Sequence, residues 1–315
     1  MIIYRKIPRK VIAIFYVVAV AVFLYLYLKG TDFSQLKTIT INWWYIVIAS
    51  FWALLFRYSM VYIWRVILRS LGTNKLPGFG IMAEVFAKAW ISRYIPGTVT
   101  WIAGKIYMAS QFGISKSRLA VSSLLEGGMQ VVAAVVVSLL LIGFNPHINT
   151  IPLYVRILTV VISIISLFIL LPPVFNRILH FAHVSIKKQP PSDELRINGS
   201  AVIKSFLWFV VGTFLNGTAC YFLAIAVTGS GSTSLYFYIV GAFGLAGAIG
   251  MATPLLPSGL GVRDGVLLVL LGAVMPKDIA LAITVLSRLW QVAVDGIFLG
   301  CTVAYSRITG EEIRT

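Results

Sequence analysis

Several charged side chains stand inside long apolar runs, where they are the residues best placed to do chemistry. A charge in hydrocarbon costs at least about 2.5–3.5 kcal/mol by insertion scales, so such a residue usually faces a partner, water or a substrate. Glu126 and Gln130 are four residues apart and share one face of a helix. Arg288, Gln291 and Asp295 share a face of another helix, but seven residues is a loose spacing for an Arg288–Asp295 pair. We therefore expect Arg288 and Asp295 each to pair with a different helix.

Two further polar sets flank Pro/Gly breaks in apolar stretches. Arg93 and Tyr94 precede the first break, and the residues of that break and its far side are Pro96-Gly97 and Gly104-Lys105. The second break lies in the run Pro257-Ser258-Gly259-Leu260-Gly261-Val262-Arg263-Asp264-Gly265. A helix that begins after such a break inside a membrane presents free N–H groups and its positive dipole end, which together bind anions. Glycine lets the backbone approach closely and arginine suits phosphate, so the motifs predict a site for an anionic head group.

The charged residues of these sets have complementary predicted roles. The bases expected to bind negative charge are Arg93, Lys105, Arg263 and Arg288. The acids expected to balance them or to carry protons are Glu126, Asp264 and Asp295. Structural ion pairing is the alternative for the charges within helices, and Arg263-Asp264 could instead be a local pair that caps a helix start. Arg57, deep in another apolar run, is open to a functional or a structural reading.

The composition excludes a soluble protein. The chain has 315 residues, of which 59% are hydrophobic and 11% charged, whereas an average soluble domain is about 25% charged. Cys220 and Cys301 lie in apolar runs and the three histidines are scattered, so we expect no disulfide framework, metal site, catalytic set or cofactor. The net charge of +16 is explained by basic cytoplasmic loops, and nucleic-acid binding is not expected.

The apolar runs predict an all-α polytopic integral membrane protein, with about six full transmembrane helices and two broken or re-entrant helix pairs. Each full span is long enough to cross about 30 Å of hydrocarbon. The six are Val11–Leu28, Trp43–Trp64, Leu119–Gly143, Pro152–Leu171, Ile203–Thr228 and Ile279–Tyr305. The broken stretches are Phe79–Phe112 and Leu235–Met275, and each enters the membrane, breaks and returns or continues as a second short helix.

The distribution of basic residues predicts that both termini are cytoplasmic and that the protein lies in the cell membrane. Lys and Arg gather in the connections that this orientation places inside, including the loop Pro172–Val202 with an expected interfacial helix at Asn176–Lys188. The connections placed outside hold only Lys29, Lys37 and Lys277.

A shift of 161 residues superposes the landmarks of the two halves without a gap. The superposed pairs are Pro96 and Pro257, Gly104 and Gly265, Lys116 and Lys277, and Gln130 and Gln291. The shift predicts a helix at 1–30, a first repeat at 40–145, a connecting helix and loop at 150–202 and a second repeat at 203–306, with broken segments at 79–112 and 235–275. An odd number of crossings between equivalent elements predicts inverted halves, a pattern that points to a transporter's binding site.

Together, Tyr94 to Gly97, Gly104-Lys105, Glu126 and the run from Leu256 to Gly265 resemble the lysylphosphatidylglycerol synthase transmembrane family. The likeness covers nearly the whole chain. The family that it resembles includes the flippase-like domain of the multiple peptide resistance factor. Asp264 replaces the expected Glu, and Lys105 stands where relatives often have Arg; both substitutions keep the charge. The resemblance implies paired re-entrant helices and movement of lipid between leaflets, and it does not imply lysyl transfer.

The sequence therefore predicts a flippase or transporter, not an enzyme, that moves an anionic or polyprenyl-phosphate-linked lipid head group between leaflets. One alternative is a non-catalytic membrane subunit that recruits a glycosyltransferase or other lipid-modifying enzyme through the basic loop Asn176–Lys204. Another is a transporter of small ions or solutes. The expected partners are membrane lipids, with a homodimer or a lipid-modifying enzyme as further candidates.

Overall fold

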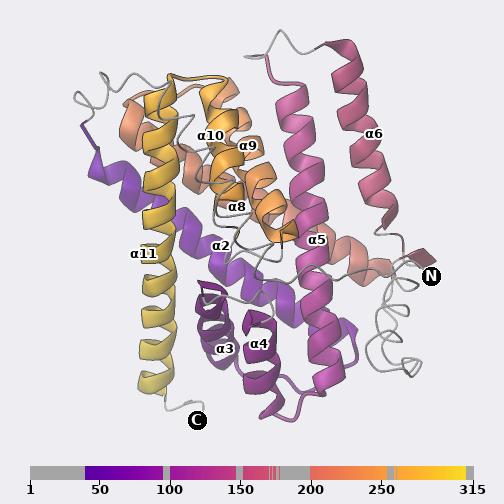
Figure 1. Cartoon of the computed structure of the whole chain (residues 1–315). Helices are drawn as coiled ribbons and strands as arrows, with labels where there is room; N and C mark the ends of the chain where they lie inside the picture. Colours follow the sequence, from indigo (N-terminus) through magenta and orange to yellow (C-terminus); the bar gives the residue numbers. More distant parts are fainter. Residues whose placement is uncertain are drawn as a thin grey trace, which may run out of the picture.

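The computed structural model describes residues 40–94, 100–146, 152–169, 171, 173–174, 177, 199–253, 259 and 261–309. Throughout these ranges the regular secondary structure is helical and contains no strand, which confirms the predicted all-α class (Figure 1). In chain order the elements are α2 (Trp43–Ser70), α3 (Phe79–Ile91), the 3-10 turn η2 (Ser92–Tyr94), α4 (Thr100–Ser110), α5 (Lys116–Gly143), α6 (Leu153–Ile169), α8 (Gly199–Thr228), α9 (Thr233–Ala252), α10 (Val262–Gly272) and α11 (Lys277–Thr309).

Five helices of the described chain are long and apolar enough to cross a membrane, namely α2, α5, α8, α9 and α11. Four of them match predicted spans, so the protein is a multi-pass membrane protein. α6 is shorter, at 17 residues, and its apolar side chains are largely exposed beside α5. The predicted span Val11–Leu28 and the interfacial helix Asn176–Lys188 fall outside the described residues, except for Arg177.

The two broken stretches differ from each other. α3, α4 and α10 have 13, 11 and 11 residues, which give about 17–20 Å each and do not reach across about 30 Å of hydrocarbon. α9 has 20 residues and is long enough to cross. In Leu235–Met275 the first helix, α9, starts after the Ser232 cap and meets no proline before Pro254, and a second short helix, α10, follows the break, as the sequence predicted.

Side-chain contacts place particular helix ends on one side of the molecule. Arg118 Nη1 donates to the Gly72 carbonyl at 3.2 Å, joining the start of α5 to the end of α2. Ser306 donates to Glu84, joining the end of α11 to α3. These elements occupy the lower part of Figure 1, where the C-terminus also lies.

Two further hydrogen bonds join helix ends on the opposite side of the molecule. The Asn42 N–H donates to the Ala226 carbonyl at 3.0 Å, between the start of α2 and the end of α8. Asn145 Nδ2 donates to the Ser234 carbonyl at 2.8 Å, between the end of α5 and the start of α9. α5 and α11 therefore run in opposite directions, as Figure 1 shows.

The helix boundaries and contacts follow the 161-residue shift. α5 starts at Lys116 and α11 at Lys277, while α3 ends at Ile91 and α9 at Ala252. α2 packs on α8, α3 on α11 as α9 does on α5, and α4 on α5 as α10 does on α11. Each contact thus has a counterpart in the other half, although the division of the chain into repeat units stays a prediction.

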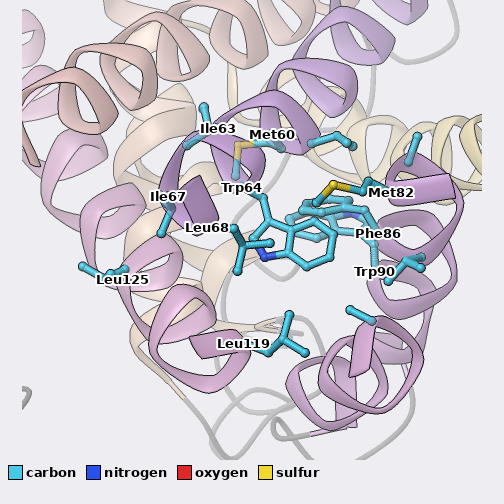
Figure 2. Packing of buried hydrophobic residues seen from close by; sticks show 14 of the residues in the cluster. Met60, Ile63, Trp64, Ile67, Leu68, Met82, Phe86, Trp90, Leu119 and Leu125 are labelled. Atoms are coloured by element: carbon cyan, nitrogen blue, oxygen red, sulfur yellow. The ribbon is translucent and has the colours of Figure 1, made fainter. Parts of the chain in front are cut away.

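Two large apolar clusters form the core. The first is centred on the first half, where Trp64 of α2 lies between Met82, Phe86 and Trp90 of α3 and Leu119 of α5, and it extends to residues of α8 and α11 (Figure 2). In the second, α8, α9, α10 and α11 enclose a cluster that includes Tyr238 and Phe243. A smaller cluster joins α2, α8 and α11. These cores hold the short helices α3, α4 and α10 in place, and so fix the polar residues at their ends.

Candidate functional site

Asp295 of α11 is a carboxylate that side chains from two other elements, α2 and η2, contact. Its Oδ1 accepts a hydrogen bond from Arg57 Nε of α2 at 2.8 Å, and its Oδ2 accepts from Arg93 Nη2 at 2.7 Å. The Tyr94 hydroxyl donates to the same Oδ2 at 2.7 Å. Asp295 therefore pairs with other helices, as expected from its loose spacing to Arg288, and ties the end of α3 to α2 and α11.

The indole of Trp90 packs beside both arginines. The guanidinium carbons of Arg93 and Arg57 lie 4.2 and 5.4 Å from the centroid of the Trp90 ring. Such cation–π contacts stabilise a guanidinium that has left water. The Arg57 side chain is 2% exposed and the Arg93 side chain is 19% exposed. Arg57 is therefore buried, whereas part of Arg93 remains accessible.

Arg263 and Asp264 are neighbours in sequence but have different contacts. Asp264 accepts the Gly261 N–H at 3.2 Å, which caps the start of α10, and its Oδ1 lies 4.0 Å from Arg288 Nη1. Arg263 instead donates to Gln291 of α11 and lies over the Phe243 ring, 4.9 Å from its centroid. The capping alternative therefore holds for Asp264, while Arg263 is directed into the molecule.

A close approach of two glycines brings Arg263 to this position. A Cβ on Gly259 would lie 2.8 Å from the Gly250 Cα atom, and Gly259 has a φ of +65°, which L side chains rarely adopt. A Cβ on Gly250 would lie 2.8 Å from Arg263 Cβ. The backbone entering α10 can therefore pack directly against the end of α9.

Lys105 and Glu126 form a separate buried pair between α4 and α5. Both side chains are 1% exposed, and Lys105 Nζ lies 4.1 Å from the Trp64 centroid and 4.5 Å from the Phe86 centroid. A buried pair of this kind is self-compensated. Trp101, 5.8 Å from Lys105 Nζ, is the ring that the pair shares with the nearby cavity wall.

A cavity of about 650 Å³ lies between the two halves. Its wall includes residues of α2, α3, η2, α4, α5, α8, α9, α10 and α11. Within the described part of the chain no Asp or Glu lines it, and its charged and polar wall residues are Arg57, Arg93, Arg263, Ser123, Gln130, Thr213, Asn216, Thr253 and Gln291. The volume falls in the range of about 300–1,000 Å³ typical of ligand sites.

The cavity reaches the molecular surface between α5 and α9. Toward one end these helices touch, since a Cβ on Gly244 would lie 2.5 Å from Ser138 Oγ. Further along, a Cβ on Gly127, Gly128 or Gly247 would meet no atom of the described residues within 4 Å. All three glycines line the cavity, and the wall residues exposed at this opening include Leu124, Gly128 and Met251.

The predicted site residues divide into three groups. Those in the cavity wall are Arg93, Gln130, Gly259, Arg263 and Gln291. Those behind or beside it are Tyr94, Gly104, Lys105, Glu126, Gly261, Asp264, Arg288 and Asp295. Pro96, Gly97, Pro257 and Ser258 lie outside the described residues.

Several wall residues carried no sequence prediction. They include Trp90, Trp101, Ser123, Thr213, Asn216 and the glycines Gly127, Gly128 and Gly247. An amide such as Asn216 in the middle of a span is a usable signal, because polar groups are costly in lipid. Among the described residues no group of three or more His, Cys, Asp and Glu side chains could hold a metal ion.

Fold and site define a multi-pass helical membrane protein with a cationic cavity between two interrupted helix pairs. The chain belongs to the family described as the lysylphosphatidylglycerol synthase TM region, whose model matches residues 11–298. The match confirms the resemblance seen in the sequence, and it relates this membrane protein to a family named for a membrane lipid. A search of curated proteins found no match.

Proposed function

We propose that the protein moves a lipid with an anionic head group between the leaflets of the cell membrane, and that the head group binds in the cavity. The observation that carries this proposal is a cavity of about 650 Å³ with Arg57, Arg93 and Arg263 in its wall and no carboxylate among the described lining residues. Arginine presents a planar fork of N–H donors that matches phosphate oxygens. The family's relation to lipid fits the same substrate class.

Asp295 holds two of the cationic side chains of the cavity wall in place. This carboxylate is shared by Arg57 and Arg93, so it holds both guanidinium groups without neutralising both. An entering phosphate adds negative charge next to them without requiring a new conformation of the wall. The Lys105–Glu126 pair is compensated and buried, so we assign it a structural role in place of the predicted binding role.

The opening between α5 and α9 offers a path for the lipid tail. Gly127, Gly128 and Gly247 leave room there, and Leu124 and Met251 provide apolar surface at the mouth. The acyl or isoprenoid chain can stay in the bilayer while the head group occupies the cavity. The lower pair α3–α4 and the upper pair α9–α10 then act as gates toward opposite sides, as in transporters with inverted repeats (Figure 1).

The experiment is leaflet transfer in liposomes that contain the purified protein and a fluorescent anionic phospholipid. We expect Arg93→Gln and Arg263→Gln each to lower the transfer rate at least tenfold, while Lys204→Gln, which removes an exposed charge away from the cavity, leaves it unchanged. Equal transfer by all variants would contradict the site. Flux of a small anion without lipid movement would favour a solute transporter, and a stoichiometric copurifying enzyme without transfer would favour a recruiting subunit.

A further inference from the structure

The charged groups around the cavity do not balance. Arg57 and Arg93 share the single carboxylate of Asp295. Arg263 is hydrogen-bonded to the neutral amide of Gln291, and Asp264 lies next to Arg288. Among the described residues around the cavity, these four guanidinium groups face two carboxylates, which leaves an excess of two positive charges. The Lys105–Glu126 pair contributes nothing to this excess because its charges cancel.

Two guanidinium nitrogens at the site are buried and lack hydrogen-bond acceptors. Arg93 Nε and Arg263 Nη2 have no hydrogen-bond partner among the described residues. Arg263 is only 7% exposed and lines the cavity. A buried donor without an acceptor is uncommon in proteins and calls for an unseen partner. One of these nitrogens belongs to the first half of the chain, at Arg93, and the other belongs to the second half, at Arg263.

From the charge excess and these two donors we infer that the transported head group carries two negative charges, as a terminal phosphate monoester or a diphosphate. This inference rests on the proposed function and narrows its substrate class. Such a group supplies both the charge and the several acceptor oxygens that Arg93 and Arg263 require. A phosphodiester carries one negative charge and leaves one guanidinium uncompensated in a medium of low dielectric constant, where unpaired charge is costly.

Like charge in the cavity wall adds to the preference for a doubly charged head group. Arg93 and Arg263 both line the cavity, and two positive charges in a medium of low dielectric constant repel each other. A doubly charged ligand between Arg93 and Arg263 replaces that repulsion by two attractions. A zwitterionic head group brings its own positive charge next to the arginines, so its net electrostatic attraction to the site is weaker than that of a doubly negative head group.

The same phosphate chemistry can be carried by a diacyl lipid or by an isoprenoid lipid. The binding test therefore uses three probes on the full chain in nanodiscs of neutral lipid at pH 8: phosphatidic acid, a long-chain isoprenyl phosphate and phosphatidylglycerol. A phosphate monoester is close to doubly charged at this pH, since its second pKa is about 6. We expect the monoester lipids to bind at least tenfold more tightly than phosphatidylglycerol, and the tighter of the two identifies the tail class.

Arg263→Gln removes one of the two excess charges, so the preference for a monoester should fall to threefold or less. Lys204→Gln should keep the full preference. If Arg263→Gln does not fold, Arg93→Gln makes the same test from the other half. Equal affinity for the three lipids, or a preference that survives both substitutions, would overturn the inference while leaving transfer of phosphatidylglycerol to support the proposed function. Absence of both binding and transfer for every lipid would instead contradict the proposed function.

Discussion

At the scale of single residues, Lys105 and Glu126 test whether a buried charge serves structure or transport. Both side chains are enclosed by Trp64, Phe86 and their neighbours. Removing one member leaves an unpaired buried charge, so we expect Lys105→Met or Glu126→Gln alone to cost about 3–5 kcal/mol. The double variant leaves no charge and should recover most of that loss. Thermal unfolding of the purified variants in detergent measures the effect.

The double variant should also keep lipid transfer within about threefold of the unchanged protein, because neither side chain lines the cavity. A double-mutant cycle that shows purely additive losses would mean that the two residues are not coupled. If a stable double variant loses lipid transfer, Lys105 and Glu126 take part in lipid binding, as the sequence predicted.

The sequence identified most interior charges, but it did not separate the wall from its surroundings. Glu126 and Gln130 share a helical face by their spacing, yet only Gln130 lines the cavity, since Glu126 meets Lys105 of α4. Spacing fixes direction around one helix and says nothing about which neighbour is met there. The role of Arg57 stayed open for the same reason, because its partner Asp295 is 238 residues away.

At the scale of helices, the glycines with which α5 and α9 line the cavity make a prediction about the path of the lipid tail. A Cβ on Gly128 or Gly247 would meet no atom of the described residues within 4 Å, so Gly128→Leu and Gly247→Leu should fold normally while narrowing the proposed opening. We expect each to lower lipid transfer at least fivefold with an unchanged melting temperature. Small-anion binding, measured with inorganic phosphate, should be affected much less than lipid transfer.

Gly296→Leu is the matched control for these substitutions. Gly296 of α11 is also in open space, but it does not line the cavity, so its replacement should leave transfer unchanged. If Gly128→Leu and Gly247→Leu transfer lipid as fast as Gly296→Leu does, the tail takes another route and the proposed opening is wrong.

Most helices of the described chain were predictable, because apolar runs of about 20 residues in lipid have few alternatives to a helix. Four predicted spans were confirmed, and their ends lie within six residues of the helix ends in the structure. The sequence predicted a break near Pro254 but left open whether the helix before it crosses the membrane, and the 20 residues of α9 are enough to do so. The opening between α5 and α9 depends on the angle between two helices, which no single-helix pattern contains.

At the scale of the whole molecule, the backbone follows the 161-residue shift more closely than the charges do. α5 and α11 start at equivalent lysines, and Gln130 and Gln291 both line the cavity. Asp295, however, corresponds to Ala134 of the first half. A symmetric backbone can exchange two access states, whereas an asymmetric charge set gives the ligand one preferred orientation.

Inversion of the two halves predicts that equivalent positions face opposite sides of the membrane. Ser115 and Pro276 are equivalent under the shift, both are exposed, and each precedes a helix that begins with lysine. After replacement of Cys220 and Cys301 by alanine, we expect Pro276→Cys to react with a membrane-impermeant maleimide in intact cells. Ser115→Cys lies beside the basic ends of α2 and α5, which belong on the cytoplasmic side by the positive-inside rule, so it should react only after permeabilisation. Labelling of both cysteines from the same side would show that the halves are not inverted, and the gates formed by α3–α4 and α9–α10 could then not alternate across the bilayer.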